Sequence, residues 1–431
     1  MVEYIKQLLS IEDFRKKFLY TLFMLAIYRF GSHIPLPGID TDALQEFFKS
    51  FEGTLFYLYD IFSGGNLSRM TLFALGVMPY ISASIMMQLL TVAVPELQRL
   101  AKEEGDYGRY KINQYTRYLT LFVAFVQSIG IAIWLQGQVS PRGTPIVLDA
   151  GFLFSITTVI ALVSSTMFLV WVGDRITEKG IGNGMSLLIF AGIVAGFPSA
   201  GIRLWDMLRN GDISPFAFVG AILFILAVVV AIVFIQEAER RVPIQYPRRQ
   251  VGRQEIVGAS SYLPIKINPA GVIPIIFAQS LLIIPSTILG FIQHPIAKAL
   301  HDAFNPTTLP YNILYVAFII FFTYFYTAVL INPVDVADNL RKAGAFIPGV
   351  RPGQDTQRYL EYIINRLVFV GALFLSVVAV VPIFVSLWLN VPFYFGGTTA
   401  LIVVGVALDT INKLEAQLLQ QKYTKYRRKV R

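Results

Sequence analysis

Ten apolar runs dominate the sequence, each of about 20 residues, the length that a helix needs to cross the hydrocarbon core of a bilayer. Lipid offers no hydrogen-bond partners to an exposed backbone, so runs of this kind cross it as helices. Hydrophobic residues make up 55% of the 431-residue chain and charged residues 15%, which leaves too little polar surface for a soluble protein. The sequence therefore predicts an all-α integral membrane protein with ten transmembrane helices, at residues 18–35, 71–94, 118–136, 152–172, 184–202, 215–236, 270–292, 312–331, 364–388 and 395–411.

The net charge of +9 is unevenly distributed along the chain. An even number of spans puts both termini on one side of the membrane. Of the 36 Lys and Arg residues, 29 lie in the terminal segments and in the loops on that side. Because Lys and Arg are enriched in cytoplasmic loops, we expect a multi-pass protein with both termini in the cytoplasm.

Two of the runs share a pattern at a constant offset of 195 residues: residues 76–84 read GVMPYISAS and residues 271–279 read GVIPIIFAQ. One interpretation is that apolar helices resemble one another by chance. The other is two five-helix halves, residues 1–202 and 203–431, of which the second enters the membrane from the opposite side because five is odd. Inverted repeats place a pathway at the interface between the halves, and Pro79 and Pro274 would permit bends in helices that line it.

Patterns typical of enzymes are absent from the sequence. Its 3 His residues lack helical ligand spacing, Cys is 0, and no Ser/His/Asp pairing or phosphate loop is found. We therefore expect a non-enzyme without catalytic residues, metal or cofactor. Ionisable residues also stay near the ends of the runs, which argues against an ion-coupled carrier. The polar groups at depth, such as Gln88, Gln127 and Gln279, either form a contact that must sometimes open or serve as ordinary helix glue.

Two long basic loops on the side of the termini, residues 237–266 and 332–362, indicate a partner. In the first, the alternation of Val242 and Ile244 with other residues suggests an extended hairpin. In the second, Pro and Gly residues surround Arg351 and present its guanidinium rigidly. Topology alone would explain the charge of these loops but not their length. We interpret them as a docking surface for a partner such as RNA phosphate.

Residues 60–69, with the sequence DIFSGGNLSR, precede the second run and follow an outer loop. The Gly pair interrupts any continuous helix. Irregular backbone at membrane depth is tolerated only where protein or a water-filled cavity satisfies it. The segment therefore fits a small mobile element near the outer mouth of a pore.

These motifs resemble those of the SecY family of bacterial protein-conducting channels. The resemblance runs from just before the second span to the last, and the motifs are specific only when taken together. They are FSGGNLSR at 62–69, ALGVMPYISAS at 74–84, GIGNG at 180–184, GVIP at 271–274, ADNLRK at 337–342, PGVRPG at 348–353 and PFYFGGT at 392–398.

The resemblance implies ten helices in two inverted five-helix halves around an hourglass pore, closed by a plug and a ring of apolar side chains. The plug residues would be Ile61, Phe62, Ser63, Gly64, Gly65, Asn66, Leu67, Ser68 and Arg69. The pore ring, in which Val77 and Met185 replace the more usual isoleucine, would be Val77, Ile81, Met185, Ile189, Ile276 and Ile402. An apolar ring can exclude ions when closed and contact a passing polypeptide without reading its sequence.

Two further sets of residues follow from the same resemblance. A polar seam at a lateral gate, between the second and seventh helices, would include Ser82, Gln88, Gln127 and Asn268. Docking of a motor or ribosome would use the basic residues of the two loops, Arg248, Arg249, Arg253 and Arg351. The family often has two adjacent basic residues where this chain has Arg253 and Gln254.

The function implied by the resemblance is the translocation of unfolded secretory polypeptides across the bacterial plasma (inner) membrane and the sideways release of transmembrane segments into lipid. The implied partners are the SecE and SecG subunits, the SecA motor ATPase, translating ribosomes, signal peptides and membrane lipid. From the residues alone, a small-solute carrier with inverted repeats remains an alternative. An intramembrane enzyme is a third class, for which the sequence lacks the chemistry.

Overall fold

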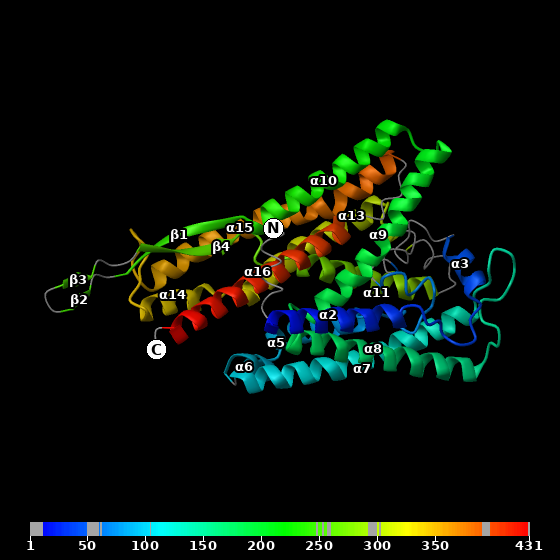
Figure 1. Cartoon of the computed structure of the whole chain (residues 1–431), viewed down its shortest axis with the longest axis horizontal. Coiled ribbons are helices and arrows are strands. Elements are labelled where there is room, and N and C mark those ends of the chain that lie inside the picture. The colour runs from blue at the N-terminus through cyan, green and yellow to red at the C-terminus, as the bar shows by residue number, and fades with distance from the viewer. Residues whose placement is uncertain are drawn as a thin grey trace. The chain divides into compact units, whose positions relative to one another are not determined.

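The computed structural model describes residues 12–49, 60, 63–103, 105–246, 249–251, 254–256, 260–291, 300, 303–389 and 397–429. Each of the ten predicted runs overlaps one of its helices (Figure 1). These helices are α2 (Glu12–Gly31), α5 (Met78–Ala93), α7 (Gly105–Gln136), α8 (Phe152–Lys179), α9 (Gly184–Asn210), α10 (Pro215–Glu237), α11 (Ile273–Phe291), α13 (Leu309–Leu330), α15 (Gln354–Leu389) and α16 (Gly397–Lys429).

Within the described residues, seven helical stretches are long and apolar enough to cross a membrane. They are α7 to α10, the stretch Leu309–Lys342 that joins α13 to α14 (Pro333–Lys342), and parts of α15 and α16. An eighth is added if α5 and α6 (Pro95–Glu103), which meet at an angle of 104°, form one broken span. The prediction of a helical multi-pass membrane protein is confirmed, and the count of ten spans is consistent with these helices.

The second and seventh runs begin their helices later than predicted. Residues 71–77 form turns, and α5 starts only at Met78. The interpretation of Pro79 and Pro274 as bends inside these helices is wrong, because each lies in the first turn of α5 or α11, where a missing N–H costs nothing. The bend of this region lies instead at Val94, whose extended backbone is favoured by the following Pro95.

Two compact units divide the chain, and each is described by itself. The first comprises Met1–Ser214, Ser280–Thr308 and Val406–Arg431, and the second Pro215–Gln279 and Leu309–Gly405. Each unit groups segments that pack against one another, so the units do not test how the chain divides into repeats. The boundary between inverted halves at residues 202 and 203 stays a prediction.

In the first unit, α7 packs lengthwise against α5 and α8 (Figure 1). The buried face of α7 is a stripe of small side chains four residues apart, Thr116, Thr120, Ala124, Ser128 and Ala132. Small residues at this spacing let helix backbones approach closely in lipid, where burial of apolar surface adds no driving force. Between α2 and α5 lies α3 (Thr41–Lys49), whose first turn is capped by the Asp40 carboxylate.

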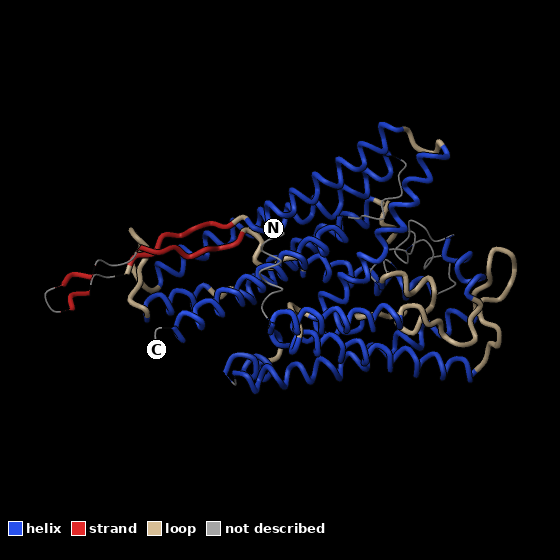
Figure 2. The backbone as a smooth tube through the Cα atoms, viewed as in Figure 1, coloured by secondary structure: helices blue, strands red, loops and turns tan. Residues whose placement is uncertain are grey.

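The second unit carries the predicted hairpin. Strands β1 (Glu239–Gln245) and β4 (Ser260–Lys266) pair antiparallel, and β2 (Arg249–Val251) pairs with β3 (Gln254–Ile256) in a separate two-stranded piece (Figure 2). Val242 and Ile265 of the hairpin pack with Ile347 and with Leu360 and Ile364 of α15 in one buried cluster. The hairpin is thereby fixed to the end of α15.

Candidate functional site

Residues 60 and 63–71 fold into a compact set of turns around the Asp60 and Ser63 side chains. The Ser63 hydroxyl donates to the Asp60 carbonyl (2.9 Å) and accepts from the Asn66 and Leu67 N–H groups (3.2 Å each). The Asp60 carboxylate accepts from the Ser68 N–H (2.8 Å). Gly64 and Gly65 adopt φ of +78° and +77°, a region that favours glycine. The segment is thus a self-contained turn structure, and Ile61 and Phe62 lie outside the described residues.

We name residues 60 and 63–71 the plug segment, after the plug predicted at residues 61–69; the segment contacts two helices of the first unit. The Tyr28 hydroxyl of α2 donates to the Ser63 carbonyl (3.2 Å) and accepts from Asn66 Nδ2 (3.4 Å). Gly64 lies against Gly192 of α9, since a Cβ built on Gly64 would lie 2.7 Å from the Gly192 Cα. Neither Tyr28 nor Gly192 was expected from sequence, because residues so far apart along the chain leave no periodic signal.

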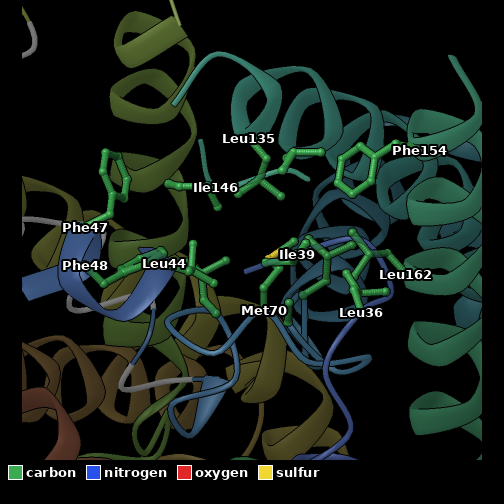
Figure 3. Close-up of a cluster of buried hydrophobic side chains, with 14 residues drawn as sticks. Leu36, Ile39, Leu44, Phe47, Phe48, Met70, Leu135, Ile146, Phe154 and Leu162 are labelled. Carbon is green, nitrogen blue, oxygen red and sulfur yellow. The ribbon is translucent and has the colours of Figure 1, made fainter. Parts of the chain in front are cut away.

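Leu67 and Met70 anchor one side of the plug segment in a hydrophobic cluster. Leu67 and Met70 are buried among side chains of α3, the loop before it and the ends of α7 and α8 (Figure 3). The described members of this cluster include Leu36, Ile39, Leu44, Phe47, Phe48, Leu135, Ile146, Phe154 and Leu162. At the other side, Ser63 lies beside Gly76, because a Cβ on Gly76 would meet the Ser63 Cα at 3.8 Å. The plug segment therefore lies beside Gly76, the residue that precedes predicted ring residue Val77 at the start of α5.

Burial also changes the pKa of the one carboxyl group described in the plug segment, that of Asp60. Asp60 is 8% exposed, and its desolvation raises the pKa of the carboxyl above its ordinary value. Hydrogen bonds from Ser68 and Leu67, and the nearby charge of Arg69, act in the opposite direction. Desolvation is the larger effect, so the segment holds a carboxyl group that is costly to ionise.

The predicted ring residues of the first unit lie at the starts of two helices. Val77 is the N-cap residue of α5, and Ile81 lies in the first turn of that helix. Met185 and Ile189 lie in the first two turns of α9. All four side chains are buried. Asn183 caps α9 by accepting from the Met185 and Ser186 N–H groups (3.1 and 3.3 Å). In the second unit Ile276 of α11 is half-buried and Ile402 of α16 is fully buried. Each ring residue thus lies near a helix start.

Three of the four predicted gate residues carry a side-chain oxygen without a partner among the described residues. Ser82 is buried, and the side-chain oxygens of Gln88, Gln127 and Asn268 accept no hydrogen bond there. Gln88 Nε2 donates to Ser84 at 3.5 Å and Asn268 Nδ2 to the Gly271 carbonyl at 2.8 Å. A buried amide oxygen without a partner is costly, so these three oxygens are the weakly satisfied polar atoms at the predicted gate positions.

The two predicted docking loops are joined by a β-bridge. The Gln245 N–H donates to the Phe346 carbonyl (2.9 Å) and the Phe346 N–H to the Gln245 carbonyl (3.0 Å). Arg351 follows on an exposed turn, and its carbonyl accepts from the Thr356 hydroxyl (2.8 Å) at the start of α15. The backbone that carries this guanidinium is therefore hydrogen-bonded to the first turn of α15. Arg248 and Arg253 lie outside the described residues, and Arg249 begins β2.

Among the described residues, no group of three or more His, Cys, Asp or Glu side chains could hold a metal ion. A family model described as SecY matches residues 71–411 of the chain. The protein translocase subunit SecY of Aquifex aeolicus is 67% identical over 429 residues, which cover 100% of this chain and 100% of that protein. The chain belongs to the SecY family.

Two solved structures share the fold of this SecY-family chain. One concerns the plug domain of SecY, described as stabilising the closed state of the translocation channel and maintaining a membrane seal; its TM-score is 0.64 at 17% identity, over 93% of this chain and 92% of that one. The other is Sec61 in the canine ribosome-channel complex from the endoplasmic reticulum, with a TM-score of 0.58 at 16% identity over 93% and 92%. These likenesses confirm the channel fold that the SecY resemblance predicted.

Proposed function

We propose that this chain is the channel subunit through which unfolded secretory polypeptides cross the plasma (inner) membrane. Membership of the SecY family is the observation that carries the proposal. The plug segment supports it, since a set of turns that lies beside Gly76 and contacts α2 and α9 suits an element that closes a pore and leaves as a unit. The chain itself would catalyse no reaction, and the energy would come from a motor or from the ribosome.

The pathway proposed here is bounded by Val77, Ile81, Met185, Ile189, Ile276 and Ile402, with residues 61–69 as the plug. Apolar side chains at a constriction exclude ions when the pore is closed and yield to any polypeptide when it is open. Met185 suits such a ring because its unbranched thioether side chain adapts to irregular surfaces.

A lateral exit would lie at Ser82, Gln88, Gln127 and Asn268. The partnerless amide oxygens of Gln127 and Asn268 support this assignment, because a seam that is poorly satisfied when closed opens at a lower cost. A signal peptide entering the seam supplies backbone and apolar surface in exchange. Transmembrane segments would then leave sideways into lipid.

The partner surface proposed here is the pair of bridged loops, with Arg248, Arg249, Arg253 and Arg351 as contacts. The β-bridge between Gln245 and Phe346 supports a single rigid surface rather than two independent loops. The exposed guanidinium of Arg351 suits carboxylates of a SecA motor and phosphates of ribosomal RNA, and the other three residues are proposed from the SecY resemblance. SecE and SecG are the proposed membrane subunits. Both termini would lie in the cytoplasm with this surface, as the Lys and Arg distribution indicates.

A reconstitution experiment tests the proposal. Proteoliposomes that contain the chain with SecE and SecG should import a precursor protein when SecA and ATP are added, measured as precursor protected from external protease. Deletion of residues 61–69 should raise the resting ion conductance of the same channels. A folded complex that protects no precursor would refute the transport function, and an unchanged conductance would refute the plug.

A further inference from the structure

The Tyr28 side chain links α2 to the plug segment by hydrogen bonds. Its hydroxyl donates to the Ser63 carbonyl at 3.2 Å and accepts from Asn66 Nδ2 at 3.4 Å. Asn66 Nδ2 also donates to the Ser63 carbonyl, and Asn66 Oδ1 accepts from the Thr71 hydroxyl at 3.2 Å. Tyr28, Ser63 and Asn66 thus close a ring of hydrogen bonds between a membrane helix and the plug segment.

The surroundings of Tyr28 hold its hydroxyl in this position. The residue is 4% exposed, and its ring stacks on Phe73 with 5.8 Å between centroids and 19° between planes. The backbone of α9 lies behind the hydroxyl, because a Cβ built on Gly192 would lie 3.0 Å from the Tyr28 oxygen. When Ser63 and Asn66 move away, this buried hydroxyl loses both of these bonds, and the Ser32 side chain is a hydrogen-bonding group that remains beside it. Breaking hydrogen bonds of a buried polar group costs free energy that only a full replacement offsets.

We propose that Tyr28 and Asn66 are positioning residues that latch the plug in the closed channel. The inference rests on the proposed function of residues 61–69 as the plug. The latch adds to the free energy that an arriving signal peptide must supply before the plug leaves, since displacement breaks the Tyr28 bonds to Ser63 and Asn66 together. Channels with a weakened latch therefore leak more ions at rest and accept precursors with weaker signal peptides.

The test uses Tyr28→Phe, which keeps the ring on Phe73 and removes only the hydroxyl, together with Asn66→Ala and the double variant. Tyr20→Phe, on the same helix, is the matched control. Full-length chain with its partner subunits is reconstituted in planar bilayers for resting conductance and in proteoliposomes for import of a precursor with a defective signal peptide. Because one net hydrogen bond corresponds to about a two- to tenfold change in an equilibrium, each single variant should raise resting conductance by about that factor.

The latch predicts a result for the double variant that a purely structural role of the two residues does not predict. The double variant should leak less than the product of the two single effects, because both substitutions break the same contact. Import of the defective precursor should rise in parallel, while Tyr20→Phe matches the unmodified channel. A Tyr28→Phe channel identical to Tyr20→Phe overturns the latch when deletion of residues 61–69 still raises conductance. If the deletion leaves the resting conductance unchanged, the assignment of residues 61–69 as the plug is refuted, and the latch, which depends on it, is refuted as well.

Discussion

Gly64 and Gly192 meet backbone to backbone, so closely that a Cβ on Gly64 would lie 2.7 Å from the Gly192 Cα. Gly64→Ala should therefore push the plug segment away from α9 and raise resting conductance. Strain contributes as well, because an alanine at φ +78° costs about 1–2 kcal/mol.

Gly65 is the matched control, because its φ of +77° imposes the same backbone strain and a Cβ added there would meet nothing within 4 Å. We expect Gly65→Ala to lower stability similarly and to leave conductance much closer to that of the unmodified channel. Equal conductance in the two variants would show that strain, and not the contact with Gly192, explains the effect.

The buried carboxyl of Asp60 should make the stability of the chain depend on pH. Its pKa in the folded chain is raised by desolvation, so its contribution to stability is fully present below the unfolded pKa and lost as pH rises through the folded value. The apparent Tm should therefore fall from about pH 4 toward neutral pH. Asp60→Asn keeps an oxygen that accepts from the Ser68 N–H without the cost of ionisation.

We expect Asp60→Asn to raise the apparent Tm at neutral pH and to flatten its pH dependence, measured by thermal unfolding in detergent. Asp42→Asn, which replaces an exposed carboxylate of α3 by an amide, is the control for the substitution itself. A slope that persists in Asp60→Asn would assign the pH dependence to other groups.

The junction of α8 and α9 should tolerate no side chain at Gly184. A Cβ there would overlap the Gly173 carbonyl oxygen and lie 2.9 Å from the Ile176 Cβ. Gly184→Ala should lower the free energy of unfolding by about 1–3 kcal/mol, as overpacking does. Gly196→Ala, in the same helix with open space around it, should be neutral or stabilise by up to about 1 kcal/mol. A Gly184→Ala variant as stable as Gly196→Ala would contradict the packing described.

Arg351 should matter for docking and not for folding. Arg351→Glu reverses the charge of an exposed side chain, so the apparent Tm should stay unchanged while SecA-dependent import is lost. Arg358→Glu makes the same charge change at an exposed residue near the start of α15. Import that is equally reduced in both variants would indicate general electrostatics instead of a contact made by Arg351.

The apolar runs allowed the positions of the helices to be predicted, because each run is long and the solvent is lipid. The repeat is the clearest example: α5 starts at Met78 and α11 at Ile273, at the same 195-residue offset as the motifs. Gly76 and Gly271 before them share a positive φ, +55° and +61°. Hydropathy could not show that residues 71–77 are turns, although Pro79 at a helix start was a readable signal.

The contacts of the plug segment could not be predicted in this way. Tyr28, Asn66 and Gly192 come together only through the packing of α2 and α9, and each has an ordinary local sequence. Asp60 likewise resembles a loop carboxylate until its burial is known. Local patterns therefore identified the segment, while its interactions depend on tertiary structure.

Cross-linking at the ring tests most directly the claim that a polypeptide passes through this chain. A precursor is arrested during import by a folded domain at its C-terminus, and photo-reactive side chains are placed one at a time at Ile81, Ile276 and, as a lipid-facing control, exposed Phe122 of α7. We predict cross-links to the precursor at Ile81 and Ile276 and none at Phe122. Cross-links absent from both ring positions while the precursor is arrested would contradict the proposed pathway.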